Sequence, residues 1–171
     1  MIVTPNHSAY NILKDYEWNY AHVPSSKPHI SKPAVEISGE WTYAGLPVRS
    51  PLAVAAGPLL NSEWIKFYAE RSFDILTYKT VRRCSRVSYG LPNLVPIEAM
   101  RVQRPGASVR GIRQMTGSWA VSFGMPSREP KIWRDDLVTA RQSLGAGQIL
   151  SVSVVATPEE GDDLKTIGED Y

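Results

Sequence analysis

The chain has 171 residues, of which 43% are hydrophobic, and this is enough to bury the core of one domain. Its formal net charge is +2, and its basic residues are scattered apart from Arg82, Arg83 and Arg86, so we expect no nucleic-acid partner. A single cysteine, Cys84, excludes an internal disulfide framework and a thiolate metal cluster.

Cellular location follows from the same composition. Single-cysteine usage fits a reducing compartment, and we take the cytoplasm as the expected location. No apolar run approaches the roughly 18 to 20 residues that a membrane span requires. The first ten residues lack the basic-then-apolar order of a secretory signal. We therefore expect neither a membrane span nor secretion.

The chain divides into an N-terminal arm, residues 1–38, and a domain, residues 39–171. The arm mixes aromatic and polar residues with Pro24, Pro28 and Pro33, which favours irregular structure. The domain opens with two short apolar runs, residues 41–43 and 46–48, separated by Ala44-Gly45. This pattern predicts a small hairpin.

The first strong strand signal covers residues 52–56, an apolar run that ends at Gly57-Pro58, as expected for a strand buried on both faces. A helix follows to about residue 71, capped by Asn61 or Ser62. Its apolar residues fall on one side at helical spacing: Leu60, Trp64, Ile65 and Tyr68. Residues 73–78 predict a second buried strand, which ends at Lys79.

Residues 80–128 show little periodicity and predict a functional loop with short strands of its own. Pro130 suits the first turn of a second helix that runs to about residue 144. Four residues of this helix are expected to face the core: Ile132, Trp133, Leu137 and Ala140.

Residues 148–156 predict a third, valine-rich strand. Thr157-Pro158-Glu159-Glu160 has capping-box spacing and predicts a third helix that starts there. We expect its inner stripe to hold three residues: Leu164, Ile167 and Tyr171. The alternation predicts an α/β fold with a parallel sheet. Three strand-helix units cannot close an eight-stranded barrel, so we expect a truncated one.

Lys79 is the most informative single residue, because active sites of barrel enzymes lie at the carboxyl ends of the strands. Burial there favours a negative or carbonyl-oxygen partner. Ala55-Ala56-Gly57 ends the preceding strand without bulky side chains, so a flat ring could lie against its backbone. The alternatives are a lysine that reaches water and small residues that serve tight packing.

Residues 122–126 precede a helix, where free backbone amides can donate to an anion or carbonyl. A plain turn is the alternative interpretation, and residues 90–93 have a similar composition. Together, the Ala-Ala-Gly strand end, Tyr78-Lys79-Thr80 and Ser-Phe-Gly-Met-Pro resemble the dihydroorotate dehydrogenase family, over roughly residues 40–171.

This resemblance implies a (β/α)8 TIM barrel that binds FMN at its mouth, of which the chain holds the first three strand-helix units after an N-terminal hairpin. Ala55, Ala56 and Gly57 would lie along the flavin. Lys79 would touch flavin and substrate, and Thr80 would add a polar contact to the flavin. The resemblance also places three residues at the pyrimidine: Phe123, where a methionine is usual, and the amides of Gly124 and Met125.

The chain departs from the family pattern in three ways. Val121 occupies the position where the family often has an asparagine that binds the pyrimidine. The linker between Lys79 and residues 122–126 is longer than in compact members. The family's general base and flavin phosphate site would lie beyond Tyr171, so we assign no catalytic residue and no metal ligand. Cys84 lies on a different loop and is not taken as the base.

The implied activity is the flavin-dependent oxidation of dihydroorotate to orotate in pyrimidine biosynthesis by the full-length parent, with the 171 residues alone inactive. One alternative is another FMN-dependent dihydropyrimidine-type oxidoreductase, which Val121 favours. A second alternative is a non-catalytic barrel fragment that binds no flavin. The expected partner is a small-molecule pyrimidine substrate, and the sequence leaves a homo-oligomer open.

Overall fold

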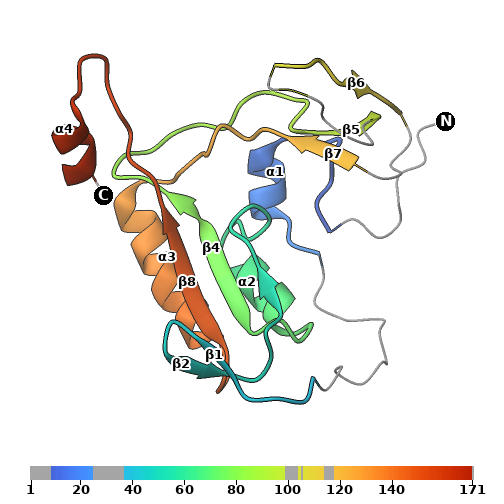
Figure 1. The fold of residues 1–171 in the computed structure, drawn as a ribbon, viewed down its shortest axis with the longest axis vertical. Helices are drawn as coiled ribbons and strands as arrows, with labels where there is room; N and C mark the ends of the chain where they lie inside the picture. The colour runs from blue at the N-terminus through green and yellow to red at the C-terminus, as the bar shows by residue number, and fades with distance from the viewer. Residues whose placement is uncertain (1–8, 25–36, 99–103, 105, 114–117, 171) are drawn as a thin grey trace. The chain divides into compact units, whose positions relative to one another are not determined.

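A computed structural model describes residues 9–24, 37–98, 104, 106–113 and 118–170. The chain forms two compact units, Met1–His22 with Ser88–Gly124, and Val23–Val87 with Met125–Tyr171. Figure 1 labels the helices and strands of both.

The second unit is built on a parallel sheet in which β4 (Ile75–Val81) lies between β3 (Ala53–Val54) and β8 (Ile149–Val154). Ala53 pairs with Ile75, and Ile75 pairs in turn with Ile149. The expected α/β class with a parallel sheet is therefore confirmed. The central strand is the one that carries Lys79 and Thr80.

Two helices, α2 (Ser62–Ala69) and α3 (Pro130–Gln142), pack against this sheet and against each other (Figure 1). The core combines buried apolar side chains from the strands, both helices and the segments that join them: Val54, Leu59, Ile65, Leu76, Tyr78, Val81, Ala140 and Leu144. As predicted, Asn61 caps α2, and its side chain accepts a hydrogen bond from the Trp64 amide at 3.2 Å.

The carboxylate of Asp136 on α3 joins α2 to β4. It accepts hydrogen bonds from the Ser62 amide at 2.8 Å, the Ser62 hydroxyl at 2.5 Å and the Tyr78 hydroxyl at 2.6 Å. A carboxylate is favourable at this position because the first turn of a helix carries free amides and partial positive charge. One side chain thus ties both helices to the central strand.

Several predicted boundaries are wrong. The first strand covers only Ala53–Val54, and the second runs on to Val81, so Lys79 lies within it rather than at its end. Ile132 does not face the core but is 51% exposed. It lies about 100° around the helix from Trp133, whereas Leu137 and Ala140 lie within about 40° of Trp133.

The third helix also begins later than expected. It is α4 (Leu164–Glu169), capped by Asp163, whose side chain accepts from the Thr166 amide at 2.8 Å. The Thr157 amide instead donates to Asp170. Leu164 is 87% exposed, so the expected inner stripe is wrong there, and Tyr171 lies outside the described residues.

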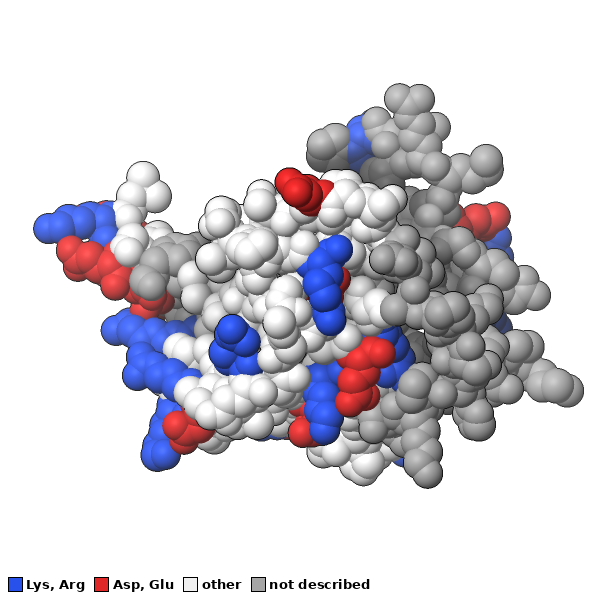
Figure 2. Space-filling view, turned by 90° about the horizontal axis from the view of Figure 1, so that it is seen from below, with Lys and Arg blue, Asp and Glu red and all other residues white. Residues whose placement is uncertain are grey.

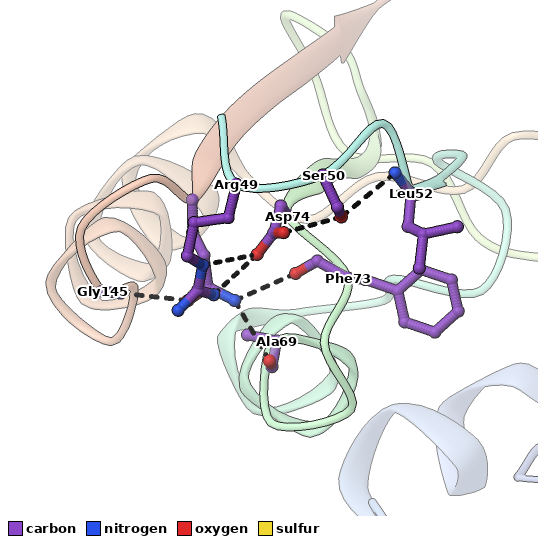
Figure 3. Close-up of polar contacts among 8 residues, drawn as sticks. Arg49, Ser50, Leu52, Ala69, Phe73, Asp74 and Gly145 are labelled. Carbon is purple, nitrogen blue, oxygen red and sulfur yellow. Dashed lines mark hydrogen bonds and ion pairs between the residues drawn. The ribbon is translucent and has the colours of Figure 1, made fainter. Parts of the chain in front are cut away.

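A polar cluster closes the end of the sheet where the parallel strands begin (Figure 3). The buried carboxylate of Asp74 accepts from Arg49 Nη2 at 2.6 Å and from the Ser50 hydroxyl at 2.7 Å. The Asp74 backbone donates to the Leu52 carbonyl at 3.0 Å and accepts from the Ile149 amide at 2.7 Å. Asp74 therefore links the start of β4 to the segment before β3 on one side and to the start of β8 on the other.

The predicted hairpin is present as β1 (Trp41–Tyr43) and β2 (Leu46–Val48), paired antiparallel. Its two turn residues, Ala44 and Gly45, have φ values of 49° and 78°. Two consecutive left-handed residues are the geometry that lets a two-residue loop match the twist of its strands.

The first unit contains α1 (Tyr16–Ala21) and an antiparallel sheet of β5 (Leu94–Glu98), flanked by β6 (Arg110–Gly111) and β7 (Ser118–Val121). The arm was expected to be irregular, but α1 is a helix with Tyr16 and Asn19 buried. The predicted short strands of the long loop are confirmed.

The described surface carries charge of both signs. On the face drawn in Figure 2, basic and acidic side chains lie in small mixed groups between uncharged atoms. Among the residues that the structure describes, no helix is both long and apolar enough to cross a membrane.

We expect Asp74→Ala to lower the free energy of unfolding by about 2 to 3 kcal/mol, because it leaves the Arg49 and Ser50 donors without their buried acceptor. Urea unfolding followed by circular dichroism measures the change. Glu98→Ala is the matched control, since its ion pair with Arg110 is exposed, and it should change stability by less than about 0.5 kcal/mol. Equal midpoints for the two variants would show that Asp74 does not stabilise the fold.

We expect Asp136→Ala to cost about 2 kcal/mol, because three hydrogen bonds are lost at one position. The neighbouring Asp135→Ala removes only an exposed pair with Lys131 and should be close to neutral. Thermal unfolding of both variants in the same buffer provides the comparison. A melting temperature for Asp136→Ala equal to that of Asp135→Ala contradicts the assigned role.

Candidate active site

Lys79 lies near the carboxyl end of the central strand and faces away from the helices. Leu76 and Tyr78, which precede it on β4, point into the core cluster, and side chains alternate along a strand. Only 5% of Lys79 is exposed. Its backbone amide donates to the Leu59 carbonyl at 2.9 Å, which ties it to the loop after β3.

The amine of Lys79 has an altered affinity for its proton. Burial lowers its pKa to about 8, and the positive charge of Arg82 acts in the same direction. Within the described part of the chain, no side chain forms an ion pair or hydrogen bond with this amine. A buried amine without a protein partner is suited to hold an anionic or carbonyl oxygen of a ligand.

The shelf residues, Ala55, Ala56 and Gly57, follow β3 on the strand next to Lys79. Ala55 and Gly57 are exposed, and Ala56 is half-buried. A methyl group added at Gly57 would meet no heavy atom within 4 Å. The space beside this glycine is therefore open.

Thr80 adds a hydroxyl beside Lys79. The pairing of β4 with β8 shifts between Tyr78 and Val81, so that two residues, Lys79 and Thr80, lie opposite one residue of β8. That residue is Ser153, whose hydroxyl lies 3.0 Å from the Thr80 hydroxyl. The bulge therefore brings the Thr80 hydroxyl next to the Ser153 hydroxyl of the neighbouring strand.

Sequence reasoning missed Ser153. The signal was present, because serine alternates with valine along residues 151–154 and so marks one polar face of an apolar strand. Ser151 pairs with Thr77 on β4, one step closer to the start of the strands. The ends of β4 and β8 thus share a face of small hydroxyl side chains.

Met125 lies in the same unit as Lys79. Its φ of 46° is in the left-handed region, which is unusual for a residue with a side chain. Its carbonyl accepts from Arg82 Nε at 3.1 Å, and its side chain is 48% exposed. The backbone at this position is therefore held in a strained conformation by a side chain from the end of β4.

Phe123 and Gly124 belong to the other unit. The Phe123 ring packs 5.4 Å from the Tyr10 ring and 5.9 Å from the Tyr16 ring, between centroids. Gly124 has a φ of 75°, and a Cβ there would lie 2.8 Å from the Tyr89 ring, so only glycine fits. The structure thus groups Lys79, Thr80, Met125 and the shelf residues in one unit, with Phe123 and Gly124 in the other.

Other chemistry is limited within the residues described. No group of three or more histidine, cysteine or acidic side chains there could hold a metal ion. Cys84 is exposed and lies beyond the end of β4. The arrangement offers a cationic amine, hydroxyls and an open backbone surface, which suits binding and orientation of a ring.

Comparison with known proteins identifies one relevant relative. The chain is 31% identical over 132 residues to a curated dihydroorotate dehydrogenase of Dictyostelium discoideum, covering 71% of this chain and 36% of the relative. The chain therefore spans about a third of the length of the relative that it matches. No family model matches the chain, and no solved structure does. This match supports a relationship of the chain to the dihydroorotate dehydrogenase family.

Proposed function

We propose that the chain forms the first three strand-helix units of a (β/α)8 barrel that binds FMN and oxidises dihydroorotate to orotate, a step of pyrimidine biosynthesis. The observation that carries the proposal is the buried Lys79 amine on β4, the strand next to β3, which leads into the shelf residues. The name of the Dictyostelium discoideum relative supports the same chemistry. FMN, when bound, supplies the hydride acceptor.

In this proposal, the chain's own residues bind the flavin and the substrate and orient them. Ala55, Ala56 and Gly57 leave space for the flat flavin ring against the backbone. Lys79 holds electron-rich oxygens of flavin and substrate, and the Thr80 and Ser153 hydroxyls offer further hydrogen bonds. Phe123, Gly124 and Met125 are proposed to contact the pyrimidine. We assign the general base to none of the described residues.

We expect Lys79→Met, in protein expressed from the complete reading frame, to lower kcat/KM for dihydroorotate by about 100-fold or more, because a charge that orients both reactants is lost. Bound flavin is measured by its visible absorbance and turnover by orotate formation. Lys66→Met on the exposed face of α2 is the matched control and should match wild type. Near-normal oxidation by Lys79→Met removes the proposed role. A wild-type protein without flavin absorbance supports the non-catalytic alternative.

The lowered pKa of Lys79 sets the expected pH dependence. The amine is charged below a pH of about 8 and loses its proton as the pH rises through that value. An anionic substrate binds the charged amine, so KM for dihydroorotate should rise above pH 8 in the wild-type protein. Initial rates between pH 6.5 and about 9.5 test this. A KM that stays flat across this range would rule out binding of the substrate through Lys79.

A second candidate function is oxidation or reduction of an uncharged dihydropyrimidine. Val121, at the end of β7, is 58% exposed and offers no side-chain hydrogen bond where the family often has an asparagine. A panel of dihydroorotate, dihydrouracil and dihydrothymine, each followed by bleaching of the flavin, separates the two functions. Faster bleaching by an uncharged substrate would favour this candidate.

A further inference from the structure

Arg82 lies one residue beyond β4, and its guanidinium is buried, with 5% of the residue exposed. Nε donates to the Met125 carbonyl at 3.1 Å. Nη1 donates to the Ala156 carbonyl at 2.7 Å and to the Thr157 hydroxyl at 3.0 Å. All three acceptors are neutral, and the described residues supply no carboxylate to this guanidinium.

The backbone of Arg82 is fixed as well. Its amide donates to the Ser127 hydroxyl at 3.0 Å, and its carbonyl accepts from Trp133 Nε1 at 3.2 Å. Arg82 therefore connects the end of β4 with residues 125–127, with α3 and with the segment after β8. These are the segments that surround the carboxyl ends of the two longer parallel strands.

A buried cation without a directly bonded carboxylate is costly for stability, because neutral acceptors offset only part of the lost hydration. An apolar side chain of similar size would fill the same space without this cost. The planar, forked guanidinium is instead suited to hold several backbone carbonyls in a fixed arrangement. This contrast indicates a role in the site rather than in the stability of the fold.

We propose that Arg82 is a positioning residue, which fixes the strained backbone at Met125 and the backbone at Ala156 around the Lys79 end of the sheet. The proposal rests on the proposed function, because Met125 and Lys79 are there assigned to the pyrimidine. Arg82 does not touch the ring itself in this role. It sets where the Met125 main chain stands and adds positive charge to the same end of the sheet.

The charge of Arg82 has a consequence that can be measured separately. It lowers the pKa of Lys79 in addition to the larger effect of burial. The neighbouring strands β3 and β8 carry no titratable side chain, and the Asp136 carboxylate of α3 is engaged by Ser62 and Tyr78. The other charged residues of the helices packed on β4 are exposed: Glu63 and Lys66 on α2, and Lys131, Arg134, Asp135 and Arg141 on α3. Arg82 is therefore the charge that acts on Lys79.

The experiment uses the full-length protein with two variants, Arg82→Gln and Arg82→Lys. Two properties are measured in each: the pH dependence of Lys79 acetylation, mapped by mass spectrometry, and KM and kcat for dihydroorotate. Arg82→Gln removes the charge and should shift the acetylation midpoint of Lys79 upward by about 0.5 pH unit and raise KM about tenfold. Arg82→Lys keeps the charge but not the fork, so it should retain the wild-type acetylation midpoint and still raise KM.

Arg83→Gln is the matched control, because Arg83 is adjacent but exposed and pairs with Asp170 instead. It should leave both properties at wild-type values. A wild-type KM in both Arg82 variants overturns the positioning role, and so does an Arg83→Gln shift as large as that of Arg82→Gln. If Arg82→Gln does not fold, the KM of Arg82→Lys alone decides whether Arg82 is a positioning residue: a raised KM supports the role, and a wild-type KM overturns it. Absence of dihydroorotate turnover in wild type would reject the proposed function, whereas the Lys79 acetylation midpoint still reports the effect of Arg82.

Discussion

The contacts of Asp74 are the constraint on which the rest of the second unit depends. Its carboxylate is bound by Arg49 and Ser50, and its backbone is hydrogen-bonded on one side to Leu52 and on the other to Ile149. A shift of one residue along any of these strands would turn its side chains to the opposite face. The buried polar cluster makes such a shift costly, because it would leave donors and a carboxylate without partners. The register at the start of the strands therefore determines which side chains lie at their carboxyl ends.

The two ends of the sheet are built from different kinds of contact. The start of the strands is closed by a network in which the carboxylate, guanidinium and hydroxyl groups of Asp74, Arg49 and Ser50 are paired with one another. The other end holds Lys79 with no partner among the described side chains, and Arg82 with neutral partners only. In barrel enzymes, the first end serves stability and the second serves chemistry. The function proposed for this chain assigns the same division to its three parallel strands.

Sequence reasoning located the elements whose signals are local. The Ala44-Gly45 turn and the Asn61 cap are each encoded by residues next to each other, and both are confirmed. The full length of β4 depends on pairing with a strand about 70 residues away, which no local pattern reports. The start of α4 was misplaced because Thr157 and Asp163 both have the chemistry of a cap. Sequence reasoning could not predict a positioning role for Arg82, because the carbonyls that it binds come from segments distant in the sequence.

The bulge on β4 determines which side chains lie at the carboxyl end of the sheet. By setting Lys79 and Thr80 against the single residue Ser153, it lets two adjacent side chains serve one rim, although a regular strand would send one of them inward to the helices. Deleting the extra residue would shorten the strand, and it would also change which functional group lies at this end of the sheet. Relatives that differ by one residue at this point would then present different chemistry on an unchanged scaffold.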